Sequence, residues 1–130
     1  MRAAGLDYES RALVERDVPE PRGAGDGEAL VRVREVGICG TDRELAAFRI
    51  GFPPEGESFL VLGHEALAQV VEAGPGVREL KPGDWVAPQV RRPCKPRCFS
   101  CARGRRDLCL TGKARERGIF GLHGYFAEYA

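Results

Sequence analysis

Long apolar runs are missing from this sequence, and none approaches the roughly eighteen residues that a membrane-spanning helix needs. Its first residues, MRAAGLDYESRALV, also lack the basic, apolar and small-residue order of a secretory signal peptide. Internal repeats and low-complexity tracts are absent as well. These absences predict a cytoplasmic protein that neither spans a membrane nor takes one as a partner.

A dinucleotide-binding fingerprint is also missing. The stretch GAGDG, residues 23–27, looks like a phosphate loop, but it precedes a predicted strand. A dinucleotide-binding turn instead follows a strand and opens a helix. The sequence therefore contains no nucleotide-binding fingerprint, and it leaves the cofactor-binding residues unknown.

What the chain does contain is typical of one globular domain. It has 130 residues, of which 43% are apolar, so it can bury a core of ordinary size. Its charge is unevenly spread, because residues 91–117 carry ten Lys or Arg against two acidic side chains while the whole chain carries only +1. An arginine-rich patch can indicate nucleic-acid binding, but it can also offset clustered thiolates. We favour the second interpretation and expect no nucleic-acid partner.

Gly and Pro divide the chain into short segments with strand character. Apolar and charged residues alternate in ALVRVREV, residues 29–36, as in a half-buried strand, and the segments 65–74 and 84–90 are apolar enough for two more. Thr41 and Glu44 form a predicted capping box ahead of one short helix. The pattern indicates a mainly β barrel or sandwich carrying one long cysteine-rich excursion.

Four of the five cysteines lie in that excursion, at Cys94, Cys98, Cys101 and Cys109. Such short intervals allow one loop to place four thiolates around a single zinc ion. Disulfides and free thiols are the alternatives, and a reducing cytoplasm disfavours the first. We predict a structural zinc that replaces the hydrophobic core that this loop lacks, with the surrounding basic side chains offsetting the negative charge of the thiolates.

The fifth cysteine, Cys39, lies at the start of the predicted helix, where the helix dipole favours a thiolate. Farther along, His64 and Glu65 follow Gly63 at the start of a predicted strand. Cys, His and carboxylate are the ligands of an open catalytic zinc site. Alternatively, Cys39 and His64 are core residues and Glu65 faces solvent. Because successive strand residues point to opposite faces, His64 and Glu65 can share an ion only if the backbone departs from a regular strand there.

Three motifs in register, VGICGTD (36–42), LGHEALAQVVEAGPGV (62–77) and KPGDWVAPQV (81–90), followed by the four-cysteine segment, resemble the zinc-dependent medium-chain alcohol dehydrogenases. The resemblance covers roughly residues 25–130. It implies a GroES-like, partly open β-barrel with one or two short helices and a structural zinc lobe at about residues 91–112. It also implies a Rossmann domain for NAD or NADP. No such domain follows in residues 1–130, so we expect a truncated catalytic domain that is inactive alone.

The resemblance further implies roles for individual residues. Cys39 and His64 match catalytic zinc ligands, Glu65 matches an acidic ligand or near-ligand, and Thr41 matches the first group of a proton relay. The structural zinc ligands would be Cys94, Cys98, Cys101 and Cys109. The segments APQVRRPC and CLTGKARERGIFGLHGYFAEYA look most like the glucose and aldose dehydrogenase branch, in which Glu116, Gln89 and His123 would face the sugar.

We therefore expect a zinc-dependent dehydrogenase that oxidises a sugar hydroxyl, most specifically a glucose 1-dehydrogenase with two zinc ions per chain. Alcohol, polyol or threonine dehydrogenases of the same family are alternatives, and relatives are commonly homo-oligomers. A zinc-binding interaction module without catalytic activity is the alternative from another class. Separately from this choice of class, the alternative roles are a surface charge for Glu116, between Arg115 and Arg117, and a loop residue for His123.

Overall fold

The computed structural model describes residues 1–130, and most of the ordered elements are short strands. The nine strands are β1 (Arg2–Asp7), β2 (Ala12–Asp17), β3 (Ala29–Gly37), β4 (Phe59–Val61), β5 (Glu65–Ala73), β6 (Trp85–Val86), β7 (Arg91–Arg92), β8 (Arg115–Arg117) and β9 (Gly121–Leu122). The helical elements are α1 (Gly40–Ala46), α2 (Phe99–Ala102) and the 3-10 turn η1 (Arg106–Leu108). The expected mainly β class is confirmed. No helix has the length and apolar character needed to cross a membrane.

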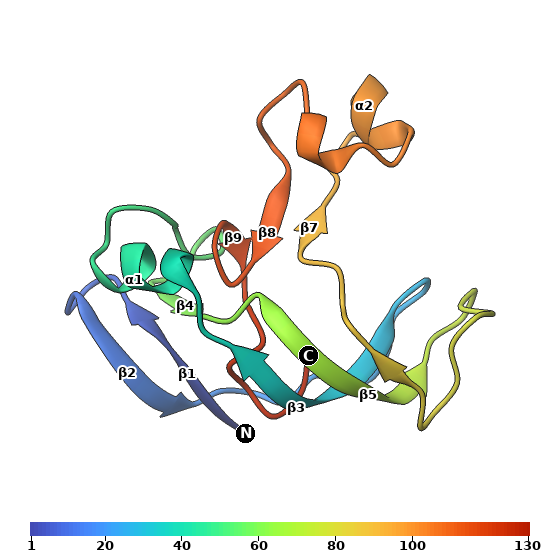
Figure 1. Cartoon of the computed structure of the whole chain (residues 1–130), viewed down its shortest axis with the longest axis horizontal. Coiled ribbons are helices and arrows are strands. Elements are labelled where there is room, and N and C mark those ends of the chain that lie inside the picture. The colour runs from blue at the N-terminus through green and yellow to red at the C-terminus, as the bar shows by residue number, and fades with distance from the viewer.

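The strands form three small sheets, in the orders β2-β1-β4, β3-β5-β6 and β7-β8-β9. All neighbours are antiparallel except β8 and β9. The C-terminal segment joins the first two sheets, because Ala127 bridges to Ala3 of β1 and Tyr129 bridges to Arg32 of β3. Figure 1 shows the long β3 and β5 crossing the middle of the molecule, with β1 and β2 on one side.

The hydrophobic core is divided among three clusters that follow the sequence pattern. The largest gathers five side chains around α1 and β4, namely Leu6, Leu45, Leu60, Leu62 and Ile119. Burying each such side chain contributes about 1.5–3 kcal/mol. In β3 the predicted alternation is present, since Val31 is buried opposite Val70 while Arg32 and Arg34 are exposed. The barrel therefore has an apolar interior that holds its own shape.

Two local predictions need correction. The segment 84–90 forms a strand only at Trp85–Val86, because Pro88 has no amide hydrogen with which to continue a ladder. The capping box is Cys39 with Asp42, and not Thr41 with Glu44. The Cys39 amide donates to Asp42 Oδ2 at 2.8 Å, and the Thr41 amide donates to Cys39 Sγ at 3.3 Å. The helix begins at Gly40, so Thr41 is already inside its first turn.

The segment between β7 and β8 projects away from the sheets as a separate lobe that carries α2 and η1 (Figure 1). Within this segment, residues 93–114, only Cys94 and Cys101 are buried. Its largest apolar side chains face outward, with Phe99 64% and Leu110 71% exposed. The lobe thus has no hydrophobic interior, as the sequence indicated.

Candidate metal centres

The four cysteines of the lobe converge on one point. Their sulfur atoms all lie within 4.8 Å of one another, and none forms a disulfide. Four sulfurs placed tetrahedrally around zinc at about 2.3 Å would be separated by roughly 3.8 Å. The four cysteine positions are therefore compatible with one tetrahedral ion, and the disulfide alternative finds no counterpart in the structure.

Local hydrogen bonds favour the thiolate form of some of these cysteines. Hydrogen bonding to the Thr111 hydroxyl lowers the pKa of Cys109 to about 5, and the backbone amides of Cys101 and Leu110 lower the pKa of Cys98. For Cys101 a backbone hydrogen bond at Cys94 lowers the pKa, yet burial and the neighbouring sulfurs raise it to about 12. Burial and the neighbouring sulfurs thus oppose ionisation of the Cys101 thiol. A divalent cation at the centre would remove the obstacle to a fourth thiolate.

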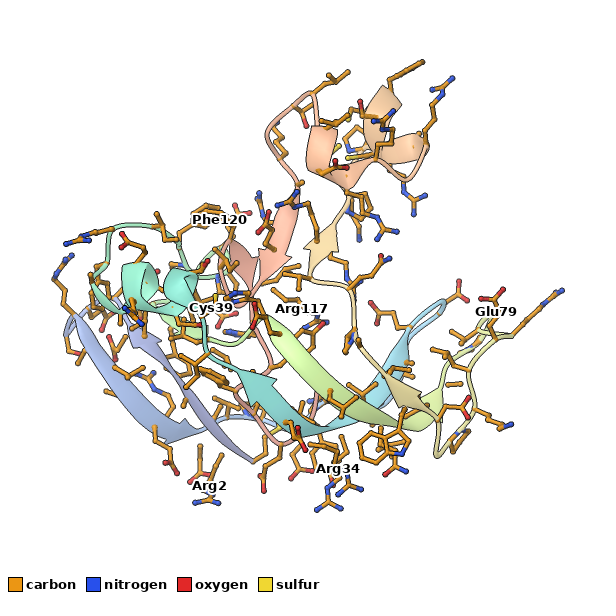
Figure 2. The ribbon with its side chains drawn as sticks, in the orientation of Figure 1. Arg2, Arg34, Cys39, Glu79, Arg117 and Phe120 are labelled. Carbon is orange, nitrogen blue, oxygen red and sulfur yellow. The ribbon has the colours of Figure 1, made fainter.

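The second cluster lies on the barrel, where Cys39 Sγ is 3.1 Å from His64 Nε2. Glu65 completes the group, since its carboxylate lies within 4.8 Å of both atoms. Cys39 follows β3 at the start of α1, as Figure 2 shows. Both Cys39 and His64 are half-buried and Glu65 is exposed. Three ligand types suited to zinc therefore meet on one side of the barrel, with the carboxylate side open to solvent.

The backbone before β5 explains how His64 and Glu65 point toward the same place. Gly63 has φ +88°, a conformation that L side chains rarely adopt, and a Cβ there would lie 2.8 Å from the ring of Phe126. His64 precedes the strand, while Glu65 is its first residue. Gly37 pairs with Glu65 across the sheet, and a Cβ at Gly37 would lie 2.7 Å from Glu65 Oε2. The departure from a regular strand that the sequence required is present.

Asp42 is a functional candidate that the sequence analysis missed. Its side chain is only 6% exposed, and its Oδ1 lies 3.7 Å from His64 Nδ1. Both of these buried atoms lack a hydrogen-bond partner. A carboxylate facing Nδ1 favours the tautomer whose Nε2 is free to bind a metal. The signal was available in the sequence as an acidic residue three positions after Cys39, at the N3 position of the helix.

The predicted relay residue Thr41 lies next to Cys39 in the first turn of α1, where it is half-buried. Its amide is held by the Cys39 sulfur at 3.3 Å. This hydrogen bond fixes the position of the threonine relative to the metal-ligand cluster.

Two of the three predicted sugar contacts lie together in an open hollow of about 350 Å³ beside β7 and β8. Gln89 and Glu116 line it, and the Glu116 side chain is 17% exposed. His123 is not among the lining residues. Its Nδ1 accepts the amide hydrogen of Val61 at 3.2 Å, and its Nε2 lies 3.0 Å from Glu57 Oε2.

The hollow and the barrel cluster are linked through touching backbone segments. Gly118 follows β8 two residues after Glu116, and a Cβ on Gly118 would lie only 2.4 Å from the carbonyl oxygen of Gly63. Gly63 in turn precedes His64 directly. The carboxylate in the hollow and the imidazole of the metal cluster are therefore carried by adjoining segments.

Comparison with known proteins places this architecture in a family. Residues 25–130 match the family described as the alcohol dehydrogenase GroES-like domain. The chain belongs to this family. The resemblance inferred from the sequence is thereby confirmed, together with the GroES-like, mainly β fold.

Several relatives of this GroES-like domain are sugar dehydrogenases. A glucose 1-dehydrogenase of Methanocella arvoryzae is 47% identical over 99% of this chain and 36% of its own length. The structure of Haloferax mediterranei glucose dehydrogenase in complex with NADP, Zn and gluconolactone matches with a TM-score of 0.88 and 42% identity, over 100% of this chain and 36% of that one. The alcohol dehydrogenase TADH from Thermus sp. ATN1 matches with a TM-score of 0.78 and 35% identity, over 99% and 36%. This chain spans about a third of the length of these relatives.

Proposed function

We propose that residues 1–130 are the zinc-binding catalytic part of an NAD(P)-dependent sugar dehydrogenase, with glucose oxidation at C1 as the specific activity. The observation that carries this proposal is the placement of a polar hollow, lined by Gln89 and Glu116, on segments adjoining the Cys39 and His64 cluster. The identity to glucose 1-dehydrogenases supports the choice of substrate. The nicotinamide cofactor would be held by a Rossmann domain outside these residues.

Two zinc ions per chain are part of the proposal. Cys39, His64 and Glu65 would hold the catalytic ion, and the second would take the lobe sulfurs, namely Cys94, Cys98, Cys101 and Cys109. The donor set supports this assignment, because a buried, unpartnered Asp42 oxygen faces the buried His64 Nδ1 and leaves Nε2 directed at Cys39. When bound at Cys39, zinc supplies Lewis-acid chemistry that makes a sugar hydroxyl more acidic.

The protein groups around this centre would manage the proton and the substrate. Thr41, whose amide donates to Cys39 Sγ, would accept the proton of the reacting hydroxyl at Oγ1 and release its own hydroxyl proton toward solvent. Glu116 would accept hydrogen bonds from sugar hydroxyls, and Gln89 would donate to them. His123 would face the sugar from the neighbouring segment. Its ring nitrogens contact the Glu57 carboxylate and the amide of Val61 in β4. A nicotinamide cofactor would supply the hydride-accepting chemistry, and the product would be a lactone.

The lining of the hollow favours sugar over a simple alcohol. Val90 is its one hydrophobic lining residue, whereas pockets for apolar ligands are lined mainly by hydrophobic side chains. The interaction-module alternative is weakened because Cys39 and His64 meet at 3.1 Å outside the three hydrophobic clusters. A cytoplasmic location and a homo-oligomeric assembly belong to the same proposal.

The proposal is tested by assaying the gene product, as encoded and loaded with zinc, for glucose-dependent reduction of NAD⁺ and NADP⁺. We expect glucose to be oxidised with one of the two cofactors, and Glu116→Gln to raise KM for glucose by roughly tenfold or more. Glu55→Gln serves as the control, because Glu55 is exposed and makes no hydrogen bond or ion pair through its side chain. Preferential oxidation of an aliphatic alcohol, or no cofactor reduction at all, would overturn the proposal.

A further inference from the structure

The hollow beside β7 and β8 has two walls of different origin. Arg91 lies in β7 and Glu116 in β8, and Gln89 lies in the irregular segment just before β7. Arg106 and Asp107 instead come from η1 inside the four-cysteine lobe. Figure 2 shows nitrogen-tipped side chains gathered between these strands and the lobe. The lobe is therefore in direct contact with the candidate sugar site.

Two hydrogen bonds across this hollow fix which atoms remain free for a ligand. Arg106 donates from Nη1 to Gln89 Oε1, so the Gln89 amide directs its remaining donors, on Nε2, away from the lobe. Arg91 donates from Nε to Glu116 Oε1 at 2.5 Å and pairs with the same carboxylate oxygen through Nη2. Glu116 Oε2 is thereby left as an acceptor. One set of donors and one acceptor in a shared hollow suit the hydroxyls of a sugar, each of which can donate and accept.

We propose that the four-cysteine lobe forms one wall of the sugar site, and that Arg106 is the residue through which it positions Gln89. This inference rests on the proposed function, because it assigns a role in that same site to a segment otherwise expected to be only architectural. Arg106 is carried by η1, three residues before Cys109, so its position depends on the order of the lobe. Any change that disorders the cysteine cluster must therefore also break the hydrogen bond from Arg106 to Gln89.

The first test measures the position of Gln89 without any substrate. The chain has only two side-chain amides of this kind, since its glutamines are Gln69 and Gln89 and it contains no asparagine. Gln69 also accepts a hydrogen bond from an arginine, Arg34, at 2.7 Å, and so it serves as an internal control. In ¹⁵N spectra of the zinc-loaded chain, Arg106→Gln adds a third pair of side-chain amide signals, from the new glutamine. It should shift the signals of Gln89 and leave those of Gln69 in place.

The second test measures the consequence for the reaction in the gene product. Arg106→Gln should raise KM for glucose by roughly fivefold to tenfold and change kcat by less than about twofold. The reason is that the Gln89 amide loses the hydrogen bond from a charged group that positions it. Arg106→Lys should recover part of the affinity. Arg105→Gln removes the same charge from the neighbouring, exposed residue, whose side chain makes no hydrogen bond, and should leave KM unchanged.

These outcomes separate the inference from the proposed function. A Gln89 signal that does not move in Arg106→Gln, or an active enzyme whose KM for glucose is the same in Arg106→Gln and Arg105→Gln, overturns the inference alone. Absence of glucose oxidation in the unsubstituted gene product instead overturns the proposed function, and the assignment of this hollow to a sugar is lost with it.

Discussion

The barrel and the lobe keep their shapes by different means. In the barrel, three apolar clusters and long ladders such as β3 with β5 hold the backbone before any ligand is considered. In the lobe, the buried residues are Cys94 and Cys101, and the helical pieces are α2 with four residues and η1 with three. A segment this short cannot sustain such elements alone, because helix nucleation is costly.

This difference shows that cysteines at the two sites differ in whether the surrounding fold needs the metal. Cys39 is set in place by a capping box and by its position after a nine-residue strand, so the barrel orders the sulfur. In the lobe the sulfurs order the chain, since little else is buried there. Metal at the first site should therefore be dispensable for folding, and metal at the second should not.

The largest effect is expected from Cys101→Ser, which removes a buried sulfur of the lobe. We expect one of two zinc ions to be lost and the amides of residues 93–114 to exchange roughly a hundredfold faster, because zinc binding there is coupled to folding. Zinc analysis and hydrogen exchange measure the two effects. The control Ser100→Ala lies one residue away and removes no sulfur ligand, so it should change neither quantity. If Cys101→Ser kept full exchange protection in the lobe, the lobe would not depend on its metal for order.

A smaller structural effect is expected from Cys39→Ser. It should also remove one zinc ion per chain and abolish the activity of the gene product, but exchange protection in β3 and β5 should change by less than about threefold, because Ser is itself a good helix N-cap. The exposed neighbour variant Ile38→Ala, measured in parallel, should retain both ions. If Cys39→Ser reduced exchange protection in the barrel as much as Cys101→Ser does in the lobe, the barrel would depend on its metal as the lobe does.

The smallest effect is expected from Asp42→Asn, which keeps a side-chain oxygen for the Cys39 amide and removes the charge facing His64. Loss of such an outer carboxylate weakens metal binding by about 10- to 100-fold. Competition with a chelator should reveal this loss at the barrel site and leave the lobe zinc unaffected. Asp26→Asn is the matched control, since Asp26 is exposed and has no ion pair or side-chain hydrogen bond. An unchanged zinc affinity in Asp42→Asn would mean that Asp42 only caps the helix.

The parts of the fold that follow a clear period were predictable from the sequence. Strands β3 and β5 matched their patterns, and α1 lies where a helix was expected. The hairpin of β1 and β2 and the three-residue β4 were missed, because they depend on each other for pairing more than on a local signal. The helix cap was placed two residues late, since a cysteine is an unusual N-cap and Thr41 is a common one.

The candidate site was predictable where motifs carry it and not where it depends on side-chain placement. Cys39, His64 and Glu65 come together as expected, as do the four lobe cysteines. Asp42 was missed, because its approach to His64 requires the actual start of α1. The contact between Arg106 and Gln89 could not be predicted either, because the sequence does not indicate on which side of the hollow the lobe lies.

The most direct test of the account is hydrogen exchange on the chain before and after complete removal of its metal by a chelator, with the zinc content measured in parallel. We predict two zinc ions at the start, and after their removal a loss of protection confined to residues 93–114 while the ladder between β3 and β5 remains protected. Simultaneous loss of protection in barrel and lobe, or an ordered lobe without metal, would contradict the account.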